Sequence, residues 1–189
     1  MPVVDTGFAS GLARVLPTWL RRQAWLSRSA ATLLGVEGAA AHAYFGIYRD
    51  LFDPAWGFRS RNRRPPRDPI NALLSLGYTL LHCSLCAALE IVGLDPYLGY
   101  YHTEQSGRPA LALDLEEEFR APVVDSLVRN IVNHRILRPE HFTPQGDEPG
   151  TWLTGRGRRI VFHQFNRKLH SEISPPGINR AISYQKLFE

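Results

Sequence analysis

Carboxylates and one histidine are the side chains whose types and spacing in this sequence could support metal chemistry. Glu37 lies in an apolar, helix-like stretch, LLGVEGAAAHAYF, where glycines and alanines surround it. Burying a carboxylate is costly unless it is paired or binds a metal, and small neighbours would let a phosphate approach closely. Pairing with one of the many arginines is the alternative, and Glu37 taken alone slightly favours that pairing.

A second group of acids, Asp114, Glu116, Glu117 and Glu118, lies in DLEEE and follows the loop that contains His102. Asp114 and Glu117 are three residues apart and would share one helix face. Each feature alone is typical of a solvated acidic face or of a surface histidine. Oxygen donors together with one imidazole suit Mg²⁺ or Mn²⁺, so the combination favours a metal site more than any single member does.

Cys83 and Cys86 form a lone C-x-x-C motif beside His82. Zinc would need four ligands, and no second pair stands at a recognisable distance. The sequence does not fit a zinc deaminase either. In that signature the H-x-E motif precedes the cysteines, whereas here the H-x-E that begins at His102 follows them. We therefore predict thiols buried in a helix rather than a site.

The basic residues are unusual in kind and in position. Of 22 basic residues only Lys168 and Lys186 are lysine, and the formal net charge is +4. High-GC coding would enrich arginine as well, so position must decide whether the arginines bind phosphate. Five fall in RSRNRRPPR, closed by two prolines, which predicts an extended, exposed segment: Arg59, Arg61, Arg63, Arg64 and Arg67. These arginines could hold a polyanion while the acids hold a divalent cation.

Composition places these residues in one globular domain. Hydrophobic residues make up 44% and charged residues 21%, which excludes a disordered tail, a collagen-like fibre and a disulfide scaffold. No apolar run is judged long enough to span a bilayer, and the first residues lack the order of a signal peptide. We therefore predict a cytoplasmic protein with no membrane partner.

The elements that must position the site are predicted to be helical. Asp68 and Pro69 supply a capping acid and a first-position proline, and the apolar residues that follow predict a helix from Pro69 to Ile91. The stretch from Pro109 to Arg135 is predicted to be a helix that Pro122 kinks or splits. Only RIVFHQF could be helix or strand. The prediction is one all-α domain over residues 1–189, with five to seven helices.

Three blocks resemble a known family: LLGVEGAAAHAYF, RNRRPPRDPINALLSLGYTLLHCSLC and GLDPYLGYYHTEQSGRPALALDLEEEFRAPVVDSLV. In this order they resemble the helical catalytic domain of the CRISPR-associated integrase, the first of the numbered CRISPR-associated (Cas) proteins. The resemblance runs from about Leu33 to Val132 and continues loosely through GTWLTGRGRRIVF, which overlaps the basic segment 151–173.

The resemblance implies a divalent metal, Mg²⁺ or Mn²⁺, bound by Glu37, His102 and Glu117, with Asp114 as a companion one helical turn earlier. It implies that the 3′ hydroxyl of a prespacer attacks a phosphodiester of the CRISPR repeat, or that water attacks in an endonuclease reaction. Backbone contacts to the DNA are assigned to the five arginines of residues 59–67 and to Arg120.

The family's β-rich N-terminal domain is not seen, because the 36 residues before Glu37 are predicted to be helical. The chain is therefore expected to be a truncation or the helical part of a fusion, for example with a reverse transcriptase. Homodimer formation and docking to the second Cas protein stay open.

Two other functions remain. One is a catalytically silent DNA-binding or assembly domain, against which the presence of every ligand type argues. The other is a plain helical interaction module, which would leave Glu37 and the arginine segment unexplained.

Overall fold

The computed structural model describes residues 30–99, 107–145, 148–175 and 179–188. Its main helices are α3 (Ala30–Tyr48), α4 (Pro69–Ile91), α5 (Ala110–Phe119), α6 (Ser126–Asn133), α7 (Gly155–Leu169) and α8 (Tyr184–Phe188). The strands are β1 (Phe142–Gln145), β2 (Glu148–Leu153), β3 (Glu172–Ile173) and β4 (Ile182–Ser183). Short 3₁₀ turns cover Arg49–Leu51, Pro54–Trp56 and Pro139–His141. The predicted all-α class is confirmed, whereas the helices predicted ahead of residue 30 lie outside the described residues.

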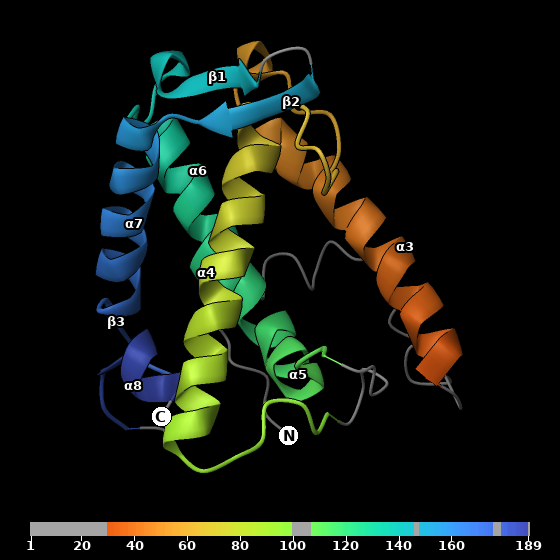
Figure 1. Ribbon diagram of the computed structural model, residues 1–189, viewed down its shortest axis with the longest axis vertical. Helices are drawn as coiled ribbons and strands as arrows, with labels where there is room; N and C mark the ends of the chain where they lie inside the picture. The colour runs from red at the N-terminus through yellow and green to blue at the C-terminus, as the bar shows by residue number, and fades with distance from the viewer. Residues whose placement is uncertain (1–29, 100–106, 146–147, 176–178, 189) are drawn as a thin grey trace.

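Helix α4 is the central element, and its prediction is confirmed at both ends. Asp68 caps it, because the Asp68 side chain accepts a hydrogen bond of 2.8 Å from the Asn71 amide. Figure 1 shows α4 running through the middle of the molecule, with α6 and α7 on one side and α3 on the other. Fully buried side chains such as Ile70, Leu74 and Leu81 place the core along this helix.

Helix α4 also corrects one expectation about membranes. At 23 residues it is long and apolar enough to cross a bilayer by length and composition, contrary to the sequence analysis. Ten of its residues are buried within the domain. Since the central helix of a globular protein passes the same test, this is weak support for a membrane span.

The predicted interruption at Pro122 is confirmed, because a π-helical turn that contains Pro122 separates two α-helices. A π-helical segment, Arg120–Asp125, joins α5 directly to α6. Proline has no amide hydrogen and its ring crowds the preceding turn, so a regular α-helix would be strained there. The π-helical turn absorbs this strain with an extra residue per turn. It leaves Asp125 fully inside the protein, at 2% exposure.

A β-hairpin that the sequence does not predict lies between α6 and α7. Strands β1 and β2 pair antiparallel, with Phe142 opposite Leu153 and Thr143 opposite Trp152. The amide of Thr151 donates a 2.7 Å hydrogen bond to the Pro66 carbonyl, so the hairpin holds the end of the arginine segment. The ambiguous stretch RIVFHQF is helical and belongs to α7, where Thr154 accepts a hydrogen bond from the Gly157 amide.

Candidate active site

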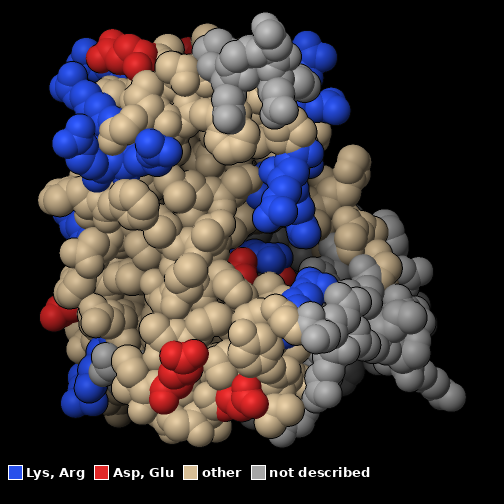
Figure 2. All heavy atoms as spheres, in the orientation of Figure 1, with Lys and Arg blue, Asp and Glu red and all other residues tan. Residues whose placement is uncertain are grey.

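A cavity of about 1270 Å³ lies between α3, the arginine segment, α4 and α5. Three acids line it, Glu116, Glu117 and Asp125, together with seven arginines: Arg49, Arg59, Arg61, Arg63, Arg64, Arg108 and Arg120. Figure 2 shows red acidic atoms deep in the hollow and blue basic atoms beside and above it. A positively charged, concave surface with acids at its floor is suited to a polyanion such as nucleic acid.

The structure describes the predicted metal ligands only in part. Glu117 lines the cavity, whereas Asp114 lies on the same helix and is not among the lining residues. Glu37 belongs to α3, but its side chain is outside the described part, and His102 lies wholly outside it. Among the side chains that are described, no group of three His, Cys, Asp or Glu residues could hold a metal ion. The metal-binding trio of Glu37, His102 and Glu117 therefore stays a prediction.

Helix register relates Glu37 to the cavity. Ala40, Ala41 and Tyr44 of α3 line it, and they follow Glu37 by three, four and seven residues. Positions with this spacing share one face of an α-helix. By helix register alone, position 37 shares a helix face with these residues, one turn before Ala40.

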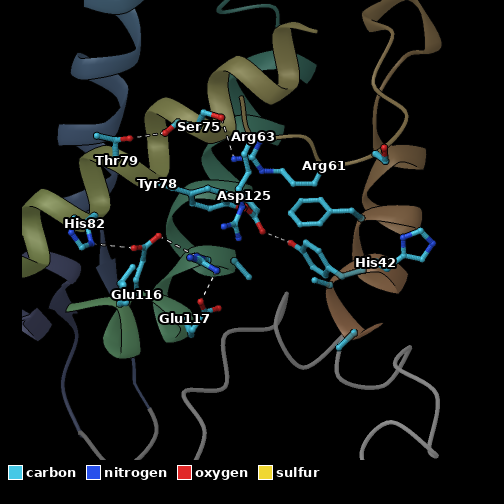
Figure 3. Close-up of a pocket in the computed structure, with 18 of the residues that line it drawn as sticks. His42, Arg61, Arg63, Ser75, Tyr78, Thr79, His82, Glu116, Glu117 and Asp125 are labelled. Atoms are coloured by element: carbon cyan, nitrogen blue, oxygen red, sulfur yellow. Dashed lines mark hydrogen bonds and ion pairs between the residues drawn. The ribbon is translucent and has the colours of Figure 1, made fainter. Parts of the chain in front are cut away.

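The acids of α5 do not form a uniformly solvated face. The Glu116 side chain is only 4% exposed, and its Oε2 is 3.3 Å from His82 Nδ1 on α4. Its other oxygen accepts a 3.1 Å hydrogen bond from Arg120 Nε. Arg120 Nη1 is also 2.5 Å from Glu117 Oε1, so one guanidinium joins both acids, as Figure 3 shows.

Arg120 is thus paired with acids in this structure, and its assignment to DNA stays a prediction. Burial acts to lower the pKa of Arg120, but the charges of Glu117 and Glu116 outweigh it and leave that pKa raised. In this state Arg120 balances the charge of the acids at the cavity floor.

Arg61 departs from the exposed segment that the sequence predicts. Its guanidinium donates to Asn71 Oδ1 at 3.0 Å and to Ser75 Oγ at 3.1 Å, both on α4. It also lies 5.4 Å from the ring centre of Tyr78. Burial lowers the pKa of Arg61. The exposed arginines are Arg59, Arg63, Arg64 and Arg67, and of these Arg67 does not line the cavity.

Asp125 is a buried acid that sequence reasoning missed. Its Oδ2 accepts a 2.5 Å hydrogen bond from Tyr44, and its Oδ1 accepts one of 2.6 Å from Tyr78. Its main-chain carbonyl accepts a third, of 2.8 Å, from Tyr48. Burial raises the pKa of Asp125 to about 6, although the phenols oppose the rise. The signal was available, because a lone acid in the apolar run PVVDSLV resembles the setting of Glu37.

The two cysteines are free thiols on α4. Cys83 is exposed, so the prediction that both thiols are buried is wrong for it. Cys86 is half-buried, with its sulfur 3.7 Å from His82 Nε2, and burial raises its pKa. A raised pKa makes a thiol less reactive, which agrees with a structural role for Cys86.

Comparison with known proteins gives consistent matches. Residues 13–167 match the family model described as CRISPR associated protein Cas1. The chain is 42% identical over 176 residues to a protein of Rhodospirillum rubrum named CRISPR-associated exonuclease Cas4/endonuclease Cas1 fusion. That alignment covers 90% of this chain and 30% of the relative.

Two solved structures resemble the fold closely. A casposase bound to integration product matches with a TM-score of 0.82 at 25% identity, over 94% of this chain and 51% of that one. A partial Cas6-RT-Cas1–Cas2 complex matches with a TM-score of 0.73 at 31% identity, over 80% of this chain and 47% of that one. The chain thus spans between 30% and 51% of the length of these proteins.

Proposed function

The chain belongs to the Cas1 family, and we propose that it forms the helical catalytic part of a metal-dependent DNA integrase and endonuclease that acts in CRISPR spacer acquisition. The observation that carries the proposal is the arginine-lined cavity with Glu117 at its floor. The names of the similar proteins, an endonuclease fusion and a casposase bound to integration product, support the same class of reaction.

The residues at the floor suit a divalent cation. Glu117 is 31% exposed, so a cation could reach its carboxylate, although it would have to share that carboxylate with Arg120, whose Nη1 is 2.5 Å from Glu117 Oε1. We propose that Glu37, His102 and Glu117, with Asp114 nearby, would hold Mg²⁺ or Mn²⁺, whose preferred ligands are carboxylate oxygens and imidazole. When bound, such an ion would polarise the reacting phosphate and offset its developing charge.

The chain's own residues would bind and orient the DNA. Arg59, Arg63 and Arg64 are exposed at the cavity and would contact backbone phosphates without reading sequence. In the proposed reaction the 3′ oxygen of one strand forms a bond to phosphorus, and the bond to the leaving 3′ oxygen of the repeat breaks. Water in place of the 3′ hydroxyl would give hydrolytic cleavage.

Further backbone contacts are proposed for Arg67 at the edge and for Arg61 and Arg120 beneath the DNA. Arg61 and Arg120 lie 5.4 and 5.3 Å from the ring centre of Tyr78. To contact a phosphate, Arg61 would have to leave Asn71 and Ser75 of α4, and Arg120 would have to leave the acids of α5.

Partners and location are proposed on the same basis. The matching Cas6-RT-Cas1–Cas2 complex supports the second Cas protein and a fused or associated reverse transcriptase as partners, and the casposase bound to integration product supports DNA. We propose a cytoplasmic location, where these partners and the CRISPR repeat would be met. We propose that the full-length family architecture forms a homodimer. The oligomeric state of this chain in solution would have to be measured directly.

The proposal is tested by strand transfer on a branched DNA that carries a CRISPR repeat, with Mn²⁺ and with EDTA. Joined or cleaved products that require the metal are expected. A silent DNA-binding or assembly domain, the alternative function, would bind the same DNA tightly and form no product in Mn²⁺.

Neutralising Arg59, Arg63 and Arg64 to glutamine is expected to weaken DNA binding and to flatten its salt dependence. Each lost phosphate contact should reduce the slope of log affinity against log salt by about 0.9, so the triple variant should lose between about 2 and 3. Fluorescence anisotropy across a salt series measures both quantities.

A matched control removes the same charge elsewhere. Arg156, Arg158 and Arg159 are exposed on α7 and do not line the cavity. Their replacement by glutamine should leave most of the slope intact. Equal losses in the two triple variants would mean that net charge, and not the cavity, binds the DNA.

A further inference from the structure

Helix α3 is joined to the rest of the described chain mainly near its C-terminal end. Tyr48 is 1% exposed, whereas earlier positions such as Gly38, Ala39 and His42 are exposed. Figure 1 shows α3 diverging from α4 toward its N-terminal end. The direction of α3, and therefore the place of Glu37, depends on what holds the residues around Tyr44 and Tyr48.

One residue, Asp125, accepts hydrogen bonds from two tyrosines of α3 at that end. Asp125 uses Oδ2 to bind Tyr44 of α3 and Oδ1 to bind Tyr78 of α4. Its main-chain carbonyl binds Tyr48, one turn further along α3. Hydrogen bonds to an ionised acceptor are shorter and stronger than neutral ones, and the distances of 2.5 and 2.6 Å agree with this. Figure 3 shows Asp125 between the two helices.

Burying the Asp125 carboxylate costs free energy that an apolar side chain at the same place would not cost. Asp125 is 2% exposed, and an apolar residue of similar size could fill the same space without desolvating a charge. The phenols of Tyr44 and Tyr78, with the more distant charges of Arg120 and Arg61, offset part of that cost. What the carboxylate adds is a directional link between α3 and α4.

The link also reaches the other side of the cavity. Asp125 ends the π-helical segment that begins at Arg120, directly after α5 and Glu117. Tyr44 lies seven residues after Glu37, which is two helical turns or about 10.5 Å along the axis. A pivot of about 5° at Tyr44 would therefore move Glu37 by about 1 Å, enough to impair a reaction that depends on alignment.

We propose that Asp125 is a positioning residue that fixes α3, and with it Glu37, relative to the helix that carries Glu117. Its carboxylate acts on α3 through the phenol of Tyr44, whereas Tyr78 of α4 binds the other carboxylate oxygen and Tyr48 donates to the main-chain carbonyl. The proposal rests on the proposed function in one respect, namely that Glu37 and Glu117 would bind the same metal ion.

The test compares two substitutions that each remove one phenol from the same carboxylate. Tyr44→Phe breaks the link to α3, whereas Tyr78→Phe breaks the link to α4 and leaves α3 attached. In hydrogen–deuterium exchange on the full chain, Tyr44→Phe should speed amide exchange of α3 by about tenfold, and Asp125→Asn should do so too. Tyr78→Phe should leave the exchange of α3 within about twofold of wild type. Equal effects of Tyr44→Phe and Tyr78→Phe, or no effect of either, would overturn the proposal.

A second measurement separates this proposal from the proposed function. Mn²⁺ binding, followed by electron paramagnetic resonance, should weaken about three- to tenfold in Tyr44→Phe and stay unchanged in Tyr78→Phe. Faster exchange of α3 with unchanged Mn²⁺ affinity would uphold the anchor and contradict the metal role of Glu37. Unchanged exchange of α3 overturns the anchor, whatever the metal affinity.

Discussion

Replacing Glu117 by glutamine is expected to lower metal-dependent strand transfer by at least about 100-fold. The substitution keeps the shape of the side chain and removes the charge that would hold a divalent cation at the cavity floor. Glu37→Ala and His102→Ala should cause losses of the same order, since the three residues would act as one unit. Product formation on repeat-containing DNA with Mn²⁺ measures all three.

Loss of stability would not explain such a result. The pair between Glu117 and Arg120 is partly exposed, and pairs of this kind contribute about 1 kcal/mol or less to folding. Glu118 is the matched control, because it is the next residue on α5, is exposed and does not line the cavity. Glu118→Gln should retain nearly full activity. Activity that survives Glu117→Gln, Glu37→Ala and His102→Ala would contradict the metal site.

Replacing Asp125 by asparagine is expected to remove a pH dependence from the stability of the protein. The pKa of Asp125 is about 6 in the folded chain, against 3.8 as the ordinary value. Between these values the folded state binds more protons than the unfolded state, so its free energy of unfolding falls as pH rises. The gap corresponds to about 3 kcal/mol, lost progressively from about pH 4 to about pH 6.

The measurement is urea denaturation of wild type and Asp125→Asn at a series of pH values. The difference in free energy of unfolding, wild type minus variant, should decrease as pH rises through this window and then level off. In Tyr44→Phe the upper end of the window should move to higher pH, because the Tyr44 hydrogen bond lowers the pKa of Asp125. A flat difference would show that Asp125 titrates near its ordinary value.

The elements predicted best were those with local signals at both ends. Helix α4 has the Asp68 cap, Pro69 in its first turn and a long apolar run, and the structure gives it the predicted bounds. The hairpin of β1 and β2 has no comparable signal. Its strands are short, contain proline and glycine, and depend on contacts made across the fold, including the link from Thr151 to Pro66.

The site was predictable in composition but not in orientation. Nothing in RSRNRRPPR distinguishes one arginine from another. Arg61 turns inward because α4 presents Asn71 and Ser75 as acceptors for its guanidinium. Likewise DLEEE does not reveal that Glu116 is buried against His82 while Glu118 is exposed. Such distinctions depend on which side of a helix meets its neighbours, and small changes of helix rotation alter them.

The π-helical turn between α5 and α6 sets the rotational phase of the two helices. Residues of an α-helix advance by about 100° each, so eight continuous steps would leave Asp125 about 80° away from Glu117 around the axis. The extra residue in the wide turn reduces this to about seven steps, and the two acids come within about 20° of the same azimuth. Both line the cavity, as that phase requires. The number of residues in this turn is therefore constrained, since losing one would rotate α6 away from the acids of α5.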